Sequence, residues 1–199
     1  MTAADRHHAL RDALVAAAER AIAAGGLASL RARDLARDAG CALGAIYTAF
    51  PDLDALVLAA NARTLESMDA ALQAAPAGRD AAAQLTALAD AYCAYAAGHH
   101  RRWAAVFDHR MAGGRAVPDW YLGVQARLFR HVEAPLARLR PDLDAPGLAR
   151  LARTVFSAVH GVVSLGLDEK LAPLEETALR EQARELAEAI ARGLALGPA

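Results

Sequence analysis

The sequence predicts an all-α protein of about nine helices, a small N-terminal set followed by a larger C-terminal set. Apolar residues recur at intervals of three and four along most of the 199-residue chain, the spacing that gathers them on one face of a helix. Glycine and proline interrupt these stripes where helices end or begin. No segment has the strict apolar–polar alternation of a half-buried β-strand.

Composition narrows the class of protein further. Hydrophobic residues make up 55% of the chain, yet no apolar run reaches the roughly 18 residues of a membrane span. The N-terminus has no signal-peptide pattern, so we expect a soluble, cytoplasmic protein. Cys41 and Cys93 form neither a disulfide nor a metal-binding pattern and are expected to be small buried hydrophobes. The net charge of −1 gives no overall basic field that would attract nucleic acid.

The first predicted helix lies within residues 1–26. Gly25 and Gly26 end it, and Ser29 is predicted to cap the helix that follows. Its apolar stripe comprises Leu10, Leu14, Ala17, Ala18, Ala21 and Ile22.

Residues 31–50 predict two short helices joined by a tight turn. The apolar stripe of the first of these two helices stops before Gly40, and this glycine supplies the positive φ that a tight turn needs. Leu43, Ile46 and Phe50 continue the stripe in the second helix. Two helices joined in this way form a helix-turn-helix unit. Because helices of about eight residues are unstable alone in water, we expect the first helix of the chain to cover this pair.

The rest of the chain also predicts helices. The fourth covers residues 53–75, with Asp52 as its cap, and Pro76 and Gly78 break it. The fifth helix ends at Gly98, and a short helix that contains Trp103–Arg110 stops at Gly113 and Gly114. A longer helix opens at Pro118, is interrupted at Pro135 and ends near Pro141. The last two cover residues 146–167 and 174–194.

Two segments resemble the TetR family of bacterial transcriptional regulators. They are LRARDLARDAGCALGAIYTAF, which begins at Leu30, and the PDLDALVLAANARTL that follows it. The pattern G-x-x-x-G-x-I-Y-x-x-F after an A-R-D-A run is specific. Further on, RRWAAVFDHR, VPDWYLGVQARLF and AVHGVVSLGL resemble a subgroup whose C-terminal domain is named for a Trp-His-Gly motif. Phe156 stands at the Trp position, and His160 and Gly161 are retained.

The resemblance implies a homodimer of helical subunits. Residues 1–52 would bind double-stranded operator DNA, and residues 53–75 would form a helix that connects them to the rest of the chain. Residues 76–199 would bind a small-molecule effector and dimerise through helices near 146–167 and 174–194. The expected function is a ligand-responsive regulator, a repressor released from a palindromic operator. The alternative is a helical dimer that binds a small molecule or a protein partner and has a degenerate, non-binding helix-turn-helix.

The third helix, about Leu43 to Ala49, would enter the major groove. The resemblance places Tyr47 on a phosphate, whereas packing of its ring with only the hydroxyl exposed is the alternative. Gly44 would let the helix approach the DNA backbone, and the Ala45 methyl would meet a thymine methyl. The predicted DNA-contact residues are Arg31, Arg33, Ala42, Leu43, Gly44, Ala45, Tyr47 and Thr48.

Several contact positions depart from the family pattern. Ala42 and Leu43 stand at commonly polar positions, and Leu53 stands where many members carry a phosphate-binding lysine. Residues 1–50 hold six arginines and five acidic residues, a net charge of +1. Because DNA affinity depends on phosphate contacts, we expect weak or salt-sensitive binding by the monomer, with dimer avidity supplying the rest.

Aromatic and cationic side chains gather in the second half of the chain. They predict a mostly apolar pocket for a planar or acidic organic effector, although core packing is the alternative for each aromatic residue. The wide apolar faces of residues 146–167 and 174–194 would also suit an intramolecular core. The predicted ligand residues are Trp103, Phe107, Arg110, Trp120, Tyr121, Phe129 and His160.

The sequence carries no catalytic motif, such as GxSxG, a P-loop, or GxGxxG after a strand. His99, His100 and His109 with Asp108 could gather a metal ion, but a solvated turn explains them more simply. We therefore expect no enzymatic activity, no cofactor and no metal.

Overall fold

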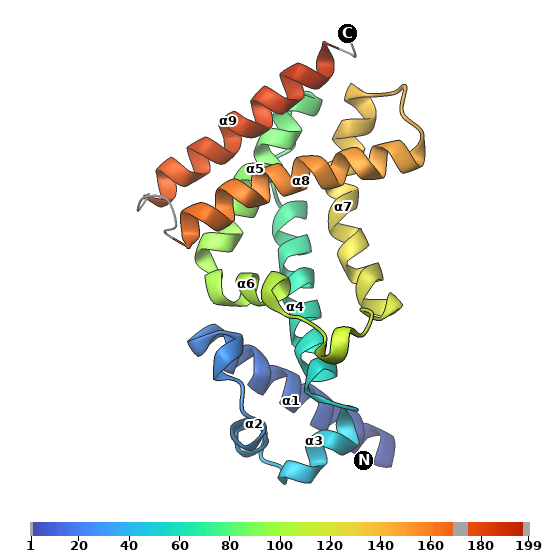
Figure 1. The fold of residues 1–199 in the computed structure, drawn as a ribbon, viewed down its shortest axis with the longest axis vertical. Coiled ribbons are helices and arrows are strands. Elements are labelled where there is room, and N and C mark those ends of the chain that lie inside the picture. The colour runs from blue at the N-terminus through green and yellow to red at the C-terminus, as the bar shows by residue number, and fades with distance from the viewer. Residues whose placement is uncertain (1, 169–174, 197–199) are drawn as a thin grey trace. The chain divides into compact units, whose positions relative to one another are not determined.

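The residues that the computed structural model describes, 2–168 and 175–196, form nine α-helices and two short 3₁₀ helices, without a β-strand among them (Figure 1). The prediction of an all-α fold is confirmed. The α-helices are α1 (Ala3–Gly25), α2 (Ala32–Asp38), α3 (Leu43–Ala49), α4 (Leu53–Gln73), α5 (Ala81–Gly98), α6 (His100–Asp108), α7 (Asp119–Leu139), α8 (Ala145–Leu167) and α9 (Glu176–Ala195). The 3₁₀ helices are η1 (Leu27–Ser29) and η2 (Ala112–Gly114).

Internal contacts divide the chain into two units. The first comprises residues 1–66 and 99–122, and the second comprises residues 67–98 and 123–199. Each unit has its own hydrophobic core. The predicted domain boundaries, at residues 52 and 75, stay a prediction.

The first unit is built around α1. Leu14 and Ala18 of this helix are buried together with Leu35 of α2 and Ile46 of α3. The two short helices therefore bury their apolar stripes against α1, as their lengths require. At its start, α1 has a reciprocal capping box between Thr2 and Asp5.

Ser29 does not cap α2, contrary to the prediction. It lies in η1, and its hydroxyl donates to the carbonyl oxygens of Ala21 at 2.9 Å and Gly26 at 2.7 Å. α2 begins after Arg31 without a side-chain cap. The Ser29 hydroxyl thus closes the turn after α1. Because Ser29 ends η1 and α2 starts only at Ala32, its side chain is not at the capping position of α2. Asp52 does cap α4, because its carboxylate accepts the Ala55 N–H at 2.8 Å.

The second unit packs α9 lengthwise along α5 and, over a shorter stretch, along α8 (Figure 1). Gly166 of α8 lies so close to Leu179 of α9 that a Cβ at this glycine would be 2.4 Å from a Leu179 methyl. Arg180 of α9 binds the Asp90 carboxylate of α5 through two hydrogen bonds, of 3.0 and 2.6 Å. Both contacts hold α9 in place. The predicted last helix began at Leu174, which lies outside the described residues.

Two further helix predictions were wrong. α7 continues through Pro135, which was expected to interrupt it. Proline removes one backbone hydrogen bond, but the next residue, Leu136, is fully buried in the core of the second unit, and this packing keeps the helix intact. α6 ends at Asp108, so Arg110 lies outside the helix that was predicted to contain it.

The two cysteines are free and differ in their surroundings. Cys93 is buried in α5, and burial raises the pKa of its thiol to about 11. Cys41 lies in the turn between α2 and α3 and is only half-buried, so the expectation of two buried cysteines holds for one of them.

Among the described residues, no single helix has both the length and the apolarity of a membrane span. α3 and α4 have this length and apolarity only when they are counted together, and the chain bends by 71° between them.

Candidate functional site

The turn between α2 and α3 depends on Gly40. Its φ of 69° lies in the left-handed region that favours glycine, and the next residue, Cys41, donates its N–H to the Ala36 carbonyl at 2.9 Å. The chain thereby reverses at once into α3. α3 then turns Ile46 and Ala49 into the core of the first unit and leaves its opposite face in solvent.

Six of the eight predicted DNA-contact residues lie in α3 or immediately before it: Ala42, Leu43, Gly44, Ala45, Tyr47 and Thr48. The other two lie earlier, Arg31 just before α2 and Arg33 within α2. The Tyr47 side chain is 53% exposed and Leu43 is 40% exposed. Ala45 is half-buried, and the other members of the set are exposed. Tyr47 thus presents much of its ring, as well as its hydroxyl, to solvent.

The arginines beside this surface differ in how they are bound. The Arg31 guanidinium donates to the carbonyls of Ala28 and Leu30, at 2.9 and 2.8 Å. Arg37 forms an ion pair with Asp34 at 2.9 Å. Arg33 makes no hydrogen bond or ion pair with any described residue. Arg33 is therefore the predicted contact arginine whose charge is available to a phosphate.

Arg11 of α1 fixes the far end of α3. Its guanidinium donates to the carbonyl oxygen of Ala49 and lies 4.1 Å from the centre of the Phe50 ring. A cation at this end of a helix is favourable because the last carbonyls carry partial negative charge. Arg11 is not among the residues predicted from the sequence. The available signal was an arginine within the apolar stripe of the first helix, one residue after Leu10.

A second arginine, Arg115, binds the start of α4, just after α3. Its guanidinium contacts the carboxylates of Asp52 and Asp54, each at 2.7 Å. Asp54 also accepts the Ala112 N–H at 2.8 Å. The connection between α6 and α7 is therefore tied to the corner between α3 and α4, within the first unit.

Hydrogen bonding and burial shift pKa values at this corner. The Ala55 N–H, followed by Arg115, lowers the pKa of the Asp52 carboxyl. The two carboxylates raise the pKa of Arg115. Burial lowers the pKa of His109, whose ring nitrogen lies 3.6 Å from the Asp54 carboxylate, and the negative charge of Asp54 opposes this shift. His109 is thus held largely neutral beside an acid.

The predicted ligand residues divide between the two units. The first unit contains Trp103, buried, with its ring centre 5.3 Å from that of Phe107. It also contains Tyr121, buried, and the adjacent Trp120, which is half-exposed. Arg110 is exposed and needs no buried partner.

Asn61 Oδ1 and the Tyr121 hydroxyl are among the buried polar atoms in the described part of the first unit that have no well-formed hydrogen bond. The Asn61 amide nitrogen donates to the Ala105 carbonyl at 3.0 Å. Burial raises the pKa of Tyr121 to about 12, against a smaller lowering by Asn61. Polar atoms left unpaired inside a protein are costly. Asn61 was missed from sequence, although a polar residue within the apolar stripe of α4 was the signal.

The second unit contains Phe129 and His160, which meet around Phe156. The His160 ring stacks on Phe156 with centres 5.5 Å apart, and Phe129 meets Phe156 edge-on at 5.4 Å. The Tyr92 hydroxyl lies 2.8 Å from His160 Nδ1. The half-buried His160 is therefore hydrogen-bonded to Tyr92, which was not among the ligand residues predicted from the sequence.

No group of three or more His, Cys, Asp and Glu side chains is placed to hold a metal ion in the parts of the chain that the structure describes.

Family comparisons match two segments of the chain. Residues 14–60 match the family described as bacterial regulatory proteins, tetR family. Residues 85–190, just over half of the chain, match the family described as tetracyclin repressor-like, C-terminal domain. No curated protein matches the chain.

Solved structures share the fold over most of their length. A protein of unknown function from Rhodococcus sp. RHA1 is 26% identical, with a TM-score of 0.71 and coverage of 94% of this chain and 95% of that one. The regulator PfmR from Thermus thermophilus is 17% identical, with a TM-score of 0.59 and coverage of 94% and 98%. The regulator FadR from Bacillus subtilis, in complex with stearoyl-CoA, is 16% identical, with a TM-score of 0.63 and coverage of 89% and 97%.

Proposed function

The chain belongs to the TetR family of bacterial transcriptional regulators and is a ligand-responsive, DNA-binding member of it; on this premise we propose that it is a homodimeric repressor, released from a palindromic operator by a small-molecule effector. The exposed surface of α3 carries this proposal. Its buried side is fixed in the core, and Arg11 holds its last carbonyl. Tyr47 and Thr48 are thereby presented on a rigid support, and Arg33 is presented from α2.

DNA contact by this surface combines phosphate binding with contacts to base methyl groups. Tyr47 and Arg33 donate to phosphates, and the backbone N–H groups at the start of α3 add further donors. Leu43 and Ala45 offer apolar contacts, which suit thymine methyls. The small number of available cations supports modest affinity per subunit, so two subunits on two half-sites are needed.

Selection from a random DNA pool tests this function. The purified protein should enrich an inverted repeat whose half-sites are about one helical turn, roughly 34 Å, apart. Binding should weaken steeply as salt is raised, because phosphate contacts release counterions. Recovery of unrelated sequences would favour the second candidate, a helical dimer with a degenerate helix-turn-helix, which the exposed Leu43 and the apolar Ala42 support.

For the effector, we propose a planar organic molecule with hydrogen-bonding groups. In the first unit, the buried polar atoms of Asn61 and Tyr121 support this chemistry, and Trp103 and Phe107 supply aromatic surface. The half-buried Tyr92–His160 pair is the candidate contact in the second unit. Phe129, Arg110 and Trp120 stay candidate contacts.

Release requires the effector to bind the two conformations of the protein unequally. An effector that favours the conformer with mis-spaced recognition helices lowers operator affinity, and the operator lowers effector affinity by the same factor. An effector that binds both conformers equally would change nothing.

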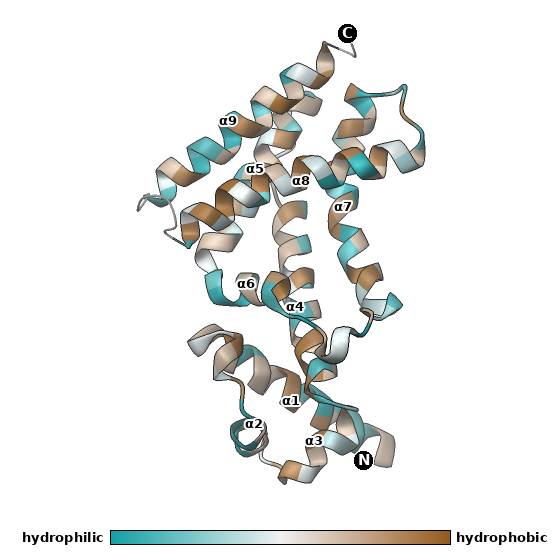
Figure 2. Cartoon of the chain, viewed as in Figure 1, coloured by the Kyte–Doolittle hydropathy of each residue, from teal (hydrophilic) through white to brown (hydrophobic). Residues whose placement is uncertain are grey.

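We propose that the dimer forms through α8 and α9 in an isologous contact. Leu165 of α8 is 41% exposed, and Figure 2 shows apolar colouring over the C-terminal part of this helix. A Cβ added at Gly161 would meet nothing within 4 Å inside one chain, which leaves room for a second subunit to approach. A cytoplasmic location, without membrane partners or catalytic activity, completes the proposal.

A further inference from the structure

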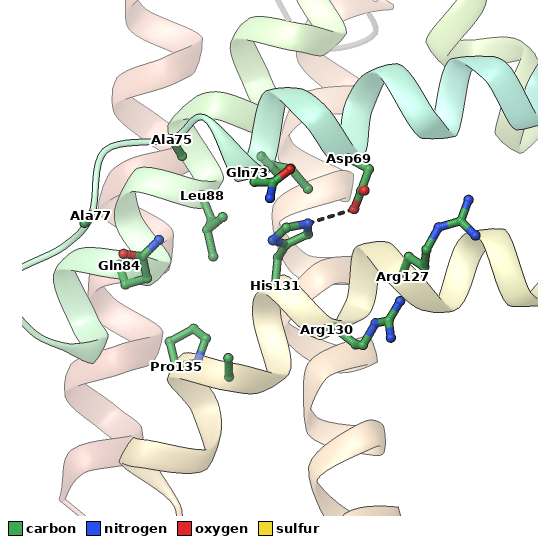
Figure 3. A pocket seen from close by; sticks show the side chains of 12 residues that line it. Asp69, Gln73, Ala75, Ala77, Gln84, Leu88, Arg127, Arg130, His131 and Pro135 are labelled. Atoms are coloured by element: carbon green, nitrogen blue, oxygen red, sulfur yellow. Dashed lines mark hydrogen bonds and ion pairs between the residues drawn. The ribbon is translucent and has the colours of Figure 1, made fainter.

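A cavity of about 510 Å³ in the second unit contains none of the seven predicted ligand residues. It lies among the end of α4, the segment that follows it, the start of α5 and the middle of α7 (Figure 3). This volume falls within the range of roughly 300–1,000 Å³ that small-molecule sites occupy.

The two ends of the cavity differ in chemistry. Figure 3 shows Arg127 and Arg130 on one side of His131, and Leu88, Gln84 and Pro135 on the other. Leu72 and Leu88 are nearly fully buried and form an apolar floor. A ligand that fits both ends has an anionic head and an apolar body.

Asp69 is the acidic residue in the lining, and it is already bound. Its carboxylate lies 2.8 Å from His131 Nε2. Arg130, by contrast, makes no hydrogen bond or ion pair within the part of the chain that the structure describes, and its side chain is exposed. The lining therefore presents one unbound guanidinium, from Arg130, and Arg127 adds a second positive charge one helical turn earlier.

The wall opposite α7 is fixed by backbone contacts. The Gly78 N–H donates to the Gln84 side-chain oxygen at 2.6 Å. A Cβ at Gly78 would lie 2.2 Å from the Gln84 backbone nitrogen, so only glycine allows this approach. The segment after α4 is thus pressed against α5, and the cavity is bounded by fixed backbone on that side.

We propose that this cavity is a binding site for a small amphipathic organic carboxylate. The carboxylate binds the guanidinium groups of Arg127 and Arg130, and the apolar body lies on Leu72, Leu88 and Pro135. Guanidinium groups match a carboxylate with paired, charge-assisted hydrogen bonds. The site belongs to the second unit, whereas the predicted DNA-contact residues, Asn61 and Tyr121 belong to the first, and it does not depend on the proposed repressor function.

Calorimetric titration of the full-length protein with 2-naphthoate tests the site. The neutral isostere 2-naphthamide should bind at least about tenfold more weakly, because it lacks the charge that the arginines bind. Inorganic phosphate, which has no apolar body, should bind weakly as well. Equal binding of naphthoate and naphthamide, equal binding of naphthoate and phosphate, or no binding of naphthoate at millimolar concentration would each overturn the proposal.

Matched variants locate the binding. Ala134 is exposed and lines the cavity, whereas Ala137 is exposed on the same helix outside it. Ala134→Phe should reduce naphthoate affinity at least about tenfold by filling the cavity, and Ala137→Phe should leave it unchanged. Arg130→Gln should weaken binding, and Arg138→Gln should not. If Ala134→Phe and Arg130→Gln bind like the unmodified protein, the ligand lies elsewhere and the assignment is wrong.

Discussion

The Asp54 carboxylate accepts a 2.7 Å hydrogen bond from the Arg115 guanidinium, across 61 positions of sequence. Asp54 belongs to the first turn of α4, and Arg115 follows η2 in the connection to α7. Because Asp52, which follows the end of α3, binds the same guanidinium, this connection is tied to the segment that joins α4 to the proposed DNA-contact helix. We infer that the contact transmits structural change within the first unit.

Replacing Asp54 by Asn and Arg115 by Gln, singly and together, measures this contact. Arg115 is 50% exposed, so solvent screens the pair and the coupling free energy between the two side chains should be small. Asp54→Asn alone should destabilise more than Arg115→Gln, because Asp54 also accepts the Ala112 N–H. Urea unfolding of the four proteins supplies the values. Additive effects of the two substitutions would show that the pair is not coupled.

The stability of the protein should depend on pH through His109. Burial lowers its pKa in the folded chain below the ordinary value near 6.5. The unfolded chain therefore binds more protons between the two values, and the stability contribution is complete above about pH 6.5 and is lost as pH falls through the folded pKa. His109→Gln should flatten this dependence. The check is urea unfolding between about pH 7.5 and 5, where parallel pH profiles for the two proteins would contradict the prediction.

The double substitution Tyr47→Phe with Thr48→Ala should weaken operator binding. Loss of two hydroxyl contacts to DNA predicts a decrease of about tenfold to a hundredfold. Both side chains are exposed, so the helical content by circular dichroism should not change. Thr177→Ala, at an exposed position in the first turn of α9, is the matched control in a mobility-shift titration. Unchanged operator affinity of the double variant would show that these residues are not contacts.

Gly166→Ala should destabilise the second unit by about 1–3 kcal/mol, because the new methyl would lie 2.4 Å from the buried Leu179 side chain. Gly123→Ala in α7, outside the proposed dimer contact, is the control. Its methyl meets nothing within 4 Å, and alanine in a helix interior is favoured over glycine by roughly 0.5–1 kcal/mol. Thermal unfolding at a fixed protein concentration should give shifts of opposite sign. Shifts of the same sign would contradict the packing that distinguishes the two glycines.

Local features of the fold could be predicted from the sequence because they depend on neighbouring residues. The positive φ of Gly40 and the cap at Asp52 follow from residue type and position. The errors arose where packing outweighed local preference. Pro135 would end an isolated helix, but burial of Leu136 keeps α7 continuous.

The support of the candidate sites could not be predicted, because it rests on contacts between residues far apart in the chain. Arg11 reaches Ala49 only when α1 packs on α3. Tyr92 meets His160 across 68 positions. Periodicity places each residue on a face of its helix, but it does not say which two faces meet.

The unequal surroundings of the two thiols give the protein a natural attachment point for a spectroscopic probe. Cys93 is buried with a pKa of about 11, so it is almost entirely protonated and inaccessible at neutral pH. Cys41 is partly exposed in the turn that precedes α3. A maleimide fluorophore should therefore attach at Cys41 alone, two residues before the proposed DNA-contact helix, and report operator and effector binding in the unmutated chain.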